Sequence, residues 1–113
     1  PQRHVINHLT GEPMIETRNI LVESARIARG GQHISALDKL KANQFDAVIL
    51  PGGFGAAKNL SSFAFDGEQM TVDDTLATIL KDFHRAQKPI GMCCISPVIL
   101  ARTIPGVRLT LGK

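Results

Sequence analysis

The chain of 113 residues is long enough for one domain, and its 43% of hydrophobic residues can form a packed core. Only 4% of the residues are aromatic and there is no Trp or Tyr, so that core must be aliphatic, and no apolar run approaches the roughly 20 residues that a membrane span requires. The net charge of +3 comes from scattered basic residues with no aromatic residues between them, so nucleic acid binding is not expected.

The cysteines and the first residues bear on the compartment. Cys93 and Cys94 are adjacent, so they cannot join distant segments, and the disulfide scaffold typical of secreted proteins is not expected. The chain opens with Pro1 and shows no secretion-type segment, so we expect a piece of a longer or processed protein. These features predict a reducing compartment. We expect the cytoplasm, or the mitochondrion if the protein comes from a eukaryote.

The first part of the chain predicts a strand end, a turn and an amphipathic helix. Residues 4–7 are typical of the end of a strand and precede a turn over 10–13. From Glu16 onward, apolar and small side chains recur at spacings of three and four: Ile20, Leu21, Ser24, Ala25, Ile27 and Ala28. Gly30–Gly31 ends this helix. A short helix is expected over 35–40.

Two all-apolar runs predict strands that are buried on both faces, as in a parallel sheet. The first run is Ala47–Leu50 and the second is Ile90–Cys93. Between them, residues 51–70 are expected to form a loop with a short helix near 56–60. A longer helix follows, capped by Thr71, with one apolar face formed by Val72, Leu76, Ile79, Leu80 and Phe83.

The chain after the second strand predicts one more helix and one more strand. Residues 94–97 form a turn, and Pro97 suits the first turn of a helix that continues over 98–103. The alternating residues 107–111 predict the further strand. The order strand, helix, strand, helix, strand implies parallel βαβ units. We therefore predict an α/β fold with a parallel sheet, in a single domain over residues 1–113.

In a parallel α/β sheet, functional sites form beyond the carboxyl ends of the strands. The two ends here are residues 51–55, called the glycine loop, and residues 93–96, called the elbow. If the two strands are neighbours, these segments face each other across a crevice. Cys94 lies where a strand turns into a helix, and the unpaired N–H groups of a helix start favour its nucleophilic thiolate.

Backbone amides beside Cys94 predict an oxyanion hole. The N–H of Ile95 is next in sequence, and the amides of Gly52 and Gly53 can supply a second donor because no side chain is in the way. The alternative left open for Cys94 is that it only fills space in the core, as cysteine often does. For Cys93, inside the apolar run, we favour that buried structural role.

Three residues of the glycine loop region are candidates for a substrate pocket: Phe54, Lys58 and Asn59. A surface lysine and a turn-forming asparagine explain Lys58 and Asn59 equally well. These three residues follow the first predicted strand, so they belong to the same end of the sheet as Cys94.

The histidines are weaker candidates for functional residues than Cys94. His4 and His8 are four residues apart, which is a metal-ligand spacing in a helix, but they flank a strand and a turn, and no third ligand is evident. His84 is expected to be a solvated helix residue and not a catalytic one. No metal and no cofactor are therefore predicted.

Several segments resemble signatures of the enhancing-lycopene-biosynthesis protein family. They are Pro51–Leu60 and Gly91–Pro97, together with Val5–Glu12 and Glu16–Asn19 near the start. The resemblance covers nearly the whole chain. It implies a partial flavodoxin-like three-layer α/β sandwich of the class I glutamine amidotransferase-like type, within the superfamily that includes the PfpI-type proteases and related glyoxalases. It also implies an association with isoprenoid biosynthesis.

The resemblance carries a nucleophile over to Cys94, because Cys-Ile-Ser-Pro here matches the family's Cys-Ile-Ala-Pro elbow. Many relatives in the wider superfamily place a His directly after the nucleophile, whereas this chain has Ile95, so true glutamine hydrolysis is not expected. The family's usual N-terminal segment is not in this chain. That segment holds the first strand, a Gly-Cys-Gly loop and an acidic residue able to hydrogen-bond the nucleophile. Its C-terminal strands and helices are not in this chain either, so an incomplete fold is expected.

The function that the resemblance implies is glyoxalase-type lyase or hydrolase chemistry, in which Cys94 attacks a small reactive carbonyl compound. The alternative is a catalytically inactive regulatory module on the same scaffold, with Cys94 as a redox sensor. The expected partners are a small-molecule substrate and, in the full-length protein, a second copy in a homodimer. Neither nucleic acid nor a membrane is expected as a partner.

Overall fold

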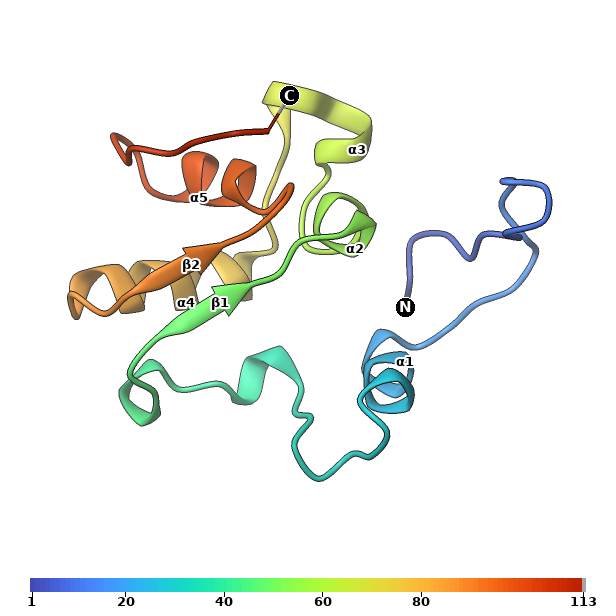
Figure 1. Cartoon of the computed structure of the whole chain (residues 1–113), viewed down its shortest axis with the longest axis horizontal. Helices are drawn as coiled ribbons and strands as arrows, with labels where there is room; N and C mark the ends of the chain where they lie inside the picture. Colours follow the sequence, from blue (N-terminus) through green and yellow to red (C-terminus); the bar gives the residue numbers. More distant parts are fainter. Residues whose placement is uncertain (113) are drawn as a thin grey trace. The chain divides into compact units, whose positions relative to one another are not determined.

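The computed structural model describes residues 1–112 and divides into two compact units, Pro1–Lys39 and Leu40–Lys113 (Figure 1). The single domain predicted over residues 1–113 stays a prediction. No helix within residues 1–112 combines the length and the apolar character that crossing a membrane requires.

The first unit opens with a narrow turn. Ile6 and Pro13 form an isolated antiparallel bridge. Beside it, the N–H of Asn7 donates to the carbonyl of Glu12 at 2.9 Å. The strand end predicted over 4–7 is thus limited to one bridge, because a strand extends only as far as its neighbour pairs with it.

Helix α1 (Ile20–Ile27) follows in the same unit and begins later than the periodicity from Glu16 predicted. Asn19 caps it, because its side-chain oxygen accepts the N–H of Val22 at 3.1 Å. None of its residues is buried, and Ile27 is 72% exposed. The 3-10 helix η1 (Leu37–Lys39) replaces the short helix expected over 35–40.

The second unit is built on a two-stranded parallel sheet. Strand β1 (Val48–Leu50) pairs with β2 (Ile90–Met92), with Ile49 opposite Gly91. The predicted adjacency of the two strands is therefore confirmed, and the glycine loop and the elbow leave the sheet at the same end. The 3-10 helix η2 (Ala42–Gln44) precedes β1.

The connection between the two strands is helical. It contains α2 (Phe54–Lys58), α3 (Phe63–Asp66), the 3-10 helix η3 (Gly67–Gln69) and α4 (Asp74–Arg85). Helices α3 and η3 lie where a loop was expected. Each is shorter than the window in which hydrophobic periodicity is detectable. The whole connection makes a βαβ unit, as predicted.

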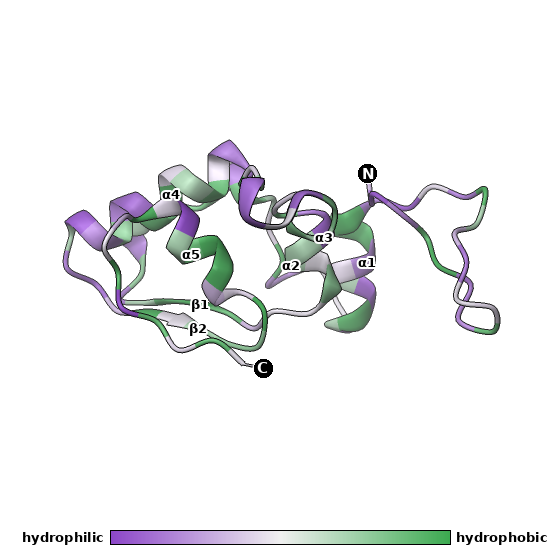
Figure 2. Cartoon of the chain, turned by 90° about the horizontal axis from the view of Figure 1, so that it is seen from above, coloured by the Kyte–Doolittle hydropathy of each residue, from purple (hydrophilic) through white to green (hydrophobic). Residues whose placement is uncertain are grey.

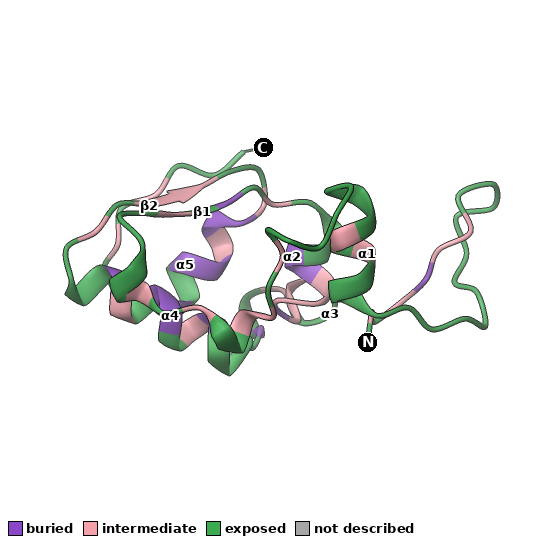
Figure 3. Cartoon of the chain, turned by 90° about the horizontal axis from the view of Figure 1, so that it is seen from below, coloured by how far each residue is buried: buried purple, intermediate pink, exposed green. Residues whose placement is uncertain are grey.

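The core of the second unit lies on one face of the sheet. Helix α5 (Pro97–Thr103) and α4 both lie on the same side of the two strands (Figure 2). Phe83, Leu80 and Ile99 are at most 1% exposed. Figure 3 shows the buried segments of this unit on α2, α4, α5 and the end of β1. The predicted apolar face is thus confirmed within α4, whose buried residues are Leu76, Ile79, Leu80 and Phe83, whereas Val72 precedes the helix and is half-buried.

The other face of the sheet is open. Ile49 is 67% exposed, although the apolar run predicted a strand buried on both faces. Side chains alternate along a strand, so Cys93 lies on the same face as Gly91, and a Cβ at Gly91 would be 3.2 Å from Cγ1 of Ile49. Cys93 is accordingly exposed, and the prediction that it is buried is wrong. The described chain holds the sheet and one helical layer of the predicted sandwich.

Two further predictions differ from the structure. Asp73 and not Thr71 caps α4, since its carboxylate accepts the N–H of Leu76 at 2.9 Å; a cap directly precedes the first helical residue. Residues 107–112 form no strand. Their alternation is suited to a sheet, but within residues 1–112 no strand pairs with them.

Candidate functional site

The turn after β2 holds Cys94 in a strained backbone conformation. Its φ is +56°, a left-handed value that is uncommon for a residue with a side chain. Pro97 occupies the first turn of α5, as predicted. A strained turn from a strand into a helix is the arrangement that exposes a nucleophile at the edge of an α/β sheet, and Cys94 is indeed exposed.

A buried serine ties this elbow to β1. Ser96 is 0% exposed, and its hydroxyl oxygen lies 2.7 Å from the carbonyl oxygen of Leu50 and 2.8 Å from that of Cys93. The same hydroxyl accepts the N–H of Cys93 at 3.0 Å. One hydroxyl proton serves one carbonyl at a time; the bond to Leu50 joins the elbow to β1, whereas the bond to Cys93 closes the turn of the elbow itself.

Ser96 was not predicted as a functional residue. The signal that was available is the hydroxyl itself, since the family motif has alanine at this position of the elbow. A buried hydroxyl costs free energy unless it is hydrogen-bonded. A buried serine two residues after the nucleophile therefore indicates a hydrogen bond that stabilises the elbow.

The glycine loop passes close against the elbow. A Cβ at Gly52 would lie 2.6 Å from the carbonyl oxygen of Cys93 and 2.9 Å from the Cβ of Cys94. Gly52 also has a φ of +96°. Both the contact and the dihedral angle require glycine here. Gly53 has a φ of +82°, but a Cβ there would meet nothing within 4 Å.

Three backbone amides border Cys94, those of Gly52, Gly53 and Ile95. Within residues 1–112, none of their N–H groups donates a hydrogen bond to another group of the protein. A Cβ at Gly52 would be 3.4 Å from the nitrogen of Ile95, so the loop and the elbow are neighbours. An oxyanion hole needs such unpaired donors. The role of these three amides stays a prediction.

A hollow of about 410 Å³ opens beside Cys94. It is lined by residues of the glycine loop, α2, α3 and the elbow: Gly53, Phe54, Ala57, Phe63, Ala64, Cys94 and Ile95. Apart from the thiol, the lining side chains are apolar. The residues from α3 were missed because that segment was expected to be a loop.

The three predicted pocket residues take different positions. Phe54 lines the hollow and is 82% exposed. Lys58 is not among the residues that line the hollow, but its ammonium nitrogen lies 5.5 Å from the centre of the Phe54 ring. Asn59 ends helix α2 and is not among the residues that line the hollow.

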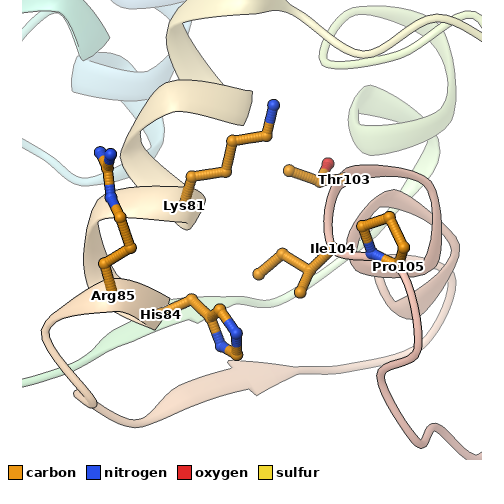
Figure 4. A pocket seen from close by; sticks show the side chains of 6 residues that line it. All are labelled: Lys81, His84, Arg85, Thr103, Ile104 and Pro105. Carbon is orange, nitrogen blue, oxygen red and sulfur yellow. The ribbon is translucent and has the colours of Figure 1, made fainter.

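A second hollow, of about 350 Å³, lies between α4 and the end of α5. Figure 4 shows Lys81 extending toward Thr103 while Arg85 points away from it, and Arg85 forms an ion pair with Asp82. His84 is exposed, as expected. Because these basic groups do not converge on one point, we assign no function to this hollow. Within the described residues, no three His, Cys, Asp or Glu side chains form a group that could hold a metal ion.

The parallel sheet, the cysteine elbow after one strand and the glycine loop after its neighbour define a class I glutamine amidotransferase-like α/β domain, present in part. The family model of the DJ-1/PfpI family matches residues 28–110. The chain therefore belongs to the DJ-1/PfpI family.

A solved structure agrees with this assignment. The isoprenoid biosynthesis protein with amidotransferase-like domain from Ehrlichia chaffeensis is similar to this chain, with a TM-score of 0.82 and 37% sequence identity. The similarity covers 95% of this chain and 50% of that protein. The predicted resemblance to amidotransferase-like isoprenoid biosynthesis proteins is confirmed, and so is the partial fold.

Curated relatives are similar over nearly the whole chain. The ES1 protein homolog, mitochondrial, of Rattus norvegicus is 57% identical over 99% of this chain and 42% of its own length. The glutamine amidotransferase-like class 1 domain-containing protein 3, mitochondrial, of Homo sapiens is 55% identical over 99% of this chain and 41% of its own length. The chain thus spans well under half of the length of these relatives.

The predicted cytoplasmic location is wrong. The rat and human relatives, and the ES1 protein, mitochondrial, of Danio rerio at 42% identity, are all mitochondrial proteins by name. The prediction rested on adjacent cysteines and on the lack of a secretion-type segment. Those features exclude only a disulfide scaffold of the secreted kind and do not separate the cytoplasm from the mitochondrion.

Proposed function

We propose that the protein containing this chain uses Cys94 as a nucleophile toward small reactive carbonyl compounds, in glyoxalase-type chemistry. The observation that carries the proposal is the exposed Cys94 at a φ of +56°, with unpaired amides of the glycine loop and of Ile95 beside it. From the names of the similar proteins, we further propose a mitochondrial location and an association with isoprenoid biosynthesis.

The proposed reaction converts a 2-oxoaldehyde and water into a 2-hydroxy acid. The Cys94 thiolate forms a C–S bond to the aldehyde carbon, the carbonyl π bond breaks, and its electron pair moves to the oxygen. The amides of Ile95 and of Gly52 or Gly53 stabilise that oxyanion. A proton leaves the former aldehyde carbon and another is added to the neighbouring carbon, which gives a thioester. Water then releases the acid and the thiol. One carbon is oxidised and its neighbour is reduced, so no external oxidant is required.

These proton transfers need a general base. The hollow beside Cys94 is lined, within residues 1–112, by no carboxylate and no imidazole. We propose that the base comes from a part of the protein outside this chain, which spans 42% of the rat relative. Turnover is therefore expected from the full-length protein.

The test is substitution of the proposed nucleophile in the full-length protein. Cys94→Ser is expected to lower the rate at which methylglyoxal becomes lactate by at least ~100-fold, because the hydroxyl is a far weaker nucleophile than the thiolate. Cys93→Ser is the matched control. It changes the exposed neighbouring thiol and should leave the rate within about twofold. An unchanged rate in Cys94→Ser rules out Cys94 as the nucleophile.

A second candidate function is a redox-sensing module without turnover. It is favoured by one observation, that both thiols are free and exposed. A peroxide would oxidise the Cys94 thiolate to a sulfenic acid while being reduced to water. Sulfenylation of Cys94 by peroxide, in a full-length protein that consumes no carbonyl compound, would favour this candidate over the first.

A further inference from the structure

We infer that the hollow beside Cys94 selects carbonyl compounds that carry an apolar substituent, which lies against Phe54 and Phe63. This inference adds a substrate preference to the proposed function. It rests on the proposed function only in assuming that Cys94 is the reacting group. It concerns the part of the substrate that does not react.

The lining of the hollow carries the inference. Besides Cys94, the lining is made of glycine, alanine, phenylalanine and isoleucine. Phe54 is 82% exposed although it stands directly beside the nucleophile. Covering such a ring with an apolar group releases water and is favourable in proportion to the area covered. A polar substituent placed against Phe54 and Phe63 would lose hydrogen bonds to water, and these two side chains offer none in return.

The size of the hollow points the same way. About 410 Å³ is within the range of roughly 300–1,000 Å³ that small-molecule sites occupy. A carbonyl compound of two or three carbons would fill a small part of that space and leave both phenylalanine rings in water. A phenyl ring or a branched aliphatic group would fill more of the hollow and cover more of its apolar lining.

Two alanines provide the room. Ala57 on α2 and Ala64 on α3 both line the hollow. Ala57 is 6% exposed and belongs to the core, so enlarging it would disturb the fold. Ala64 is exposed, so a larger side chain at this position extends into the hollow without displacing the core.

Lys58 forms a cation–π contact with Phe54, one of the residues that line the hollow. Its ammonium nitrogen lies 5.5 Å from the centre of the Phe54 ring, one helical turn away on α2. This contact restrains an otherwise exposed ring beside Cys94. A wall that is ordered before binding loses less conformational entropy when a substituent covers it.

The experiment compares two alkylating reagents that share one electrophile. In the full-length protein with Cys93→Ser, the rates at which iodoacetamide and N-phenyliodoacetamide alkylate Cys94 are measured by peptide mass spectrometry, each divided by the rate with glutathione. The phenyl reagent is expected to be favoured by about tenfold, the effect of burying one ring. Ala64→Phe, which fills the hollow, should reduce this preference to about twofold or less.

A matched control uses another exposed phenylalanine of α3. Phe65 is 45% exposed and does not line the hollow, so Phe65→Ala should keep the preference, whereas Phe54→Ala should reduce it. Equal normalised rates for the two reagents overturn the inference. A preference that survives Ala64→Phe also overturns it, because the ring would then bind elsewhere.

Alkylation needs no turnover, so this inference and the proposed function can fail separately. A protein that converts methylglyoxal but shows no reagent preference has the proposed chemistry without the apolar site. A protein with the preference but without carbonyl turnover has the apolar site and not the proposed chemistry. If both hold, kcat/KM for phenylglyoxal should exceed that for methylglyoxal by about tenfold.

Discussion

At the residue scale, the hydroxyl of Ser96 is one of the groups that hold the elbow around Cys94 in place. A left-handed φ at a residue other than glycine costs about 1–3 kcal/mol and persists only where its surroundings hold it. Ser96 supplies part of that restraint, since its buried hydroxyl lies 2.7 Å from the carbonyl oxygen of Leu50 at the end of β1. It also accepts the N–H of Cys93. We therefore regard Ser96 as a positioning residue for the nucleophile.

Ser96→Ala tests this role. It is expected to lower the free energy of unfolding by about 1 kcal/mol, the usual effect of losing one hydrogen-bonded hydroxyl. It should also slow the alkylation of Cys94 by iodoacetamide by about threefold or more, because the elbow loses one of its hydrogen bonds to β1 and keeps only that from the N–H of Cys93 to the carbonyl of Leu50. Urea unfolding and alkylation kinetics of the full-length protein measure the two effects.

Ser61→Ala is the matched control for that prediction. Ser61 is also buried; its hydroxyl donates to the carbonyl oxygen of Ala56 at 2.8 Å and accepts the N–H of Phe63 at 3.4 Å, and neither partner belongs to the elbow. It should lose a similar amount of stability and keep the alkylation rate of Cys94. If the two variants alkylate at the same rate, Ser96 only stabilises the fold.

Some residues of the site could be predicted from the sequence and others could not. Cys94 and Gly52 were predicted, because each follows a recognisable apolar strand and such strand ends meet in a parallel sheet. Phe63 and Ala64 were not, because α3 has only four residues and shows no periodicity. Their place in the hollow follows from the packing of α3 beside α2, which the local sequence does not encode.

At the scale of elements, the hydrophobic pattern predicted an element correctly where the element is long enough and packs against or pairs with another part of the chain. Periodicity predicted α4, whose apolar side is buried, while two continuous apolar runs predicted the strands β1 and β2, which pair with each other. It was insufficient for residues 107–111, which alternate but form no strand. A helix satisfies its own backbone, whereas a strand needs a neighbour to accept and donate its hydrogen bonds.

The start of α4 gives a prediction at this scale. Asp73→Ala removes the acceptor of the Leu76 N–H and should lower the free energy of unfolding by about 1 kcal/mol. Thr71→Ala changes a residue that precedes the cap and should cost less than about 0.5 kcal/mol. Denaturant unfolding of both variants in the full-length protein makes the comparison. A larger loss of stability in Thr71→Ala than in Asp73→Ala would mean that Thr71 caps the helix, as the sequence predicted.

At the scale of the whole molecule, each of the two units carries apolar surface that the unit itself does not cover. In the first unit no residue of α1 is buried, and Val22 and Ile27 are 62% and 72% exposed. In the second unit one face of the sheet is open at Ile49. Parallel sheets occur almost only with both faces covered, so the open face at Ile49 is suited to a contact beyond this unit.

The open face gives a prediction that compares two lengths of chain. In the 113-residue chain Ile49 is 67% exposed, so Ile49→Ala should cost less than about 0.5 kcal/mol. If the rest of the full-length protein covers this face of the sheet, the same change there creates a cavity and should cost about 2–5 kcal/mol.

Ile79→Ala calibrates the comparison, because Ile79 is 5% exposed in the core beneath the other face of the sheet. It should cost about 2–5 kcal/mol at both lengths. Urea unfolding of the four variants and of the unsubstituted protein at each length gives the differences. A cost for Ile49→Ala that stays small in the full-length protein would mean that this face of a parallel sheet remains in water. The sheet would then be an exception to the rule that both faces are buried, and the apolar run of β1 would need another explanation.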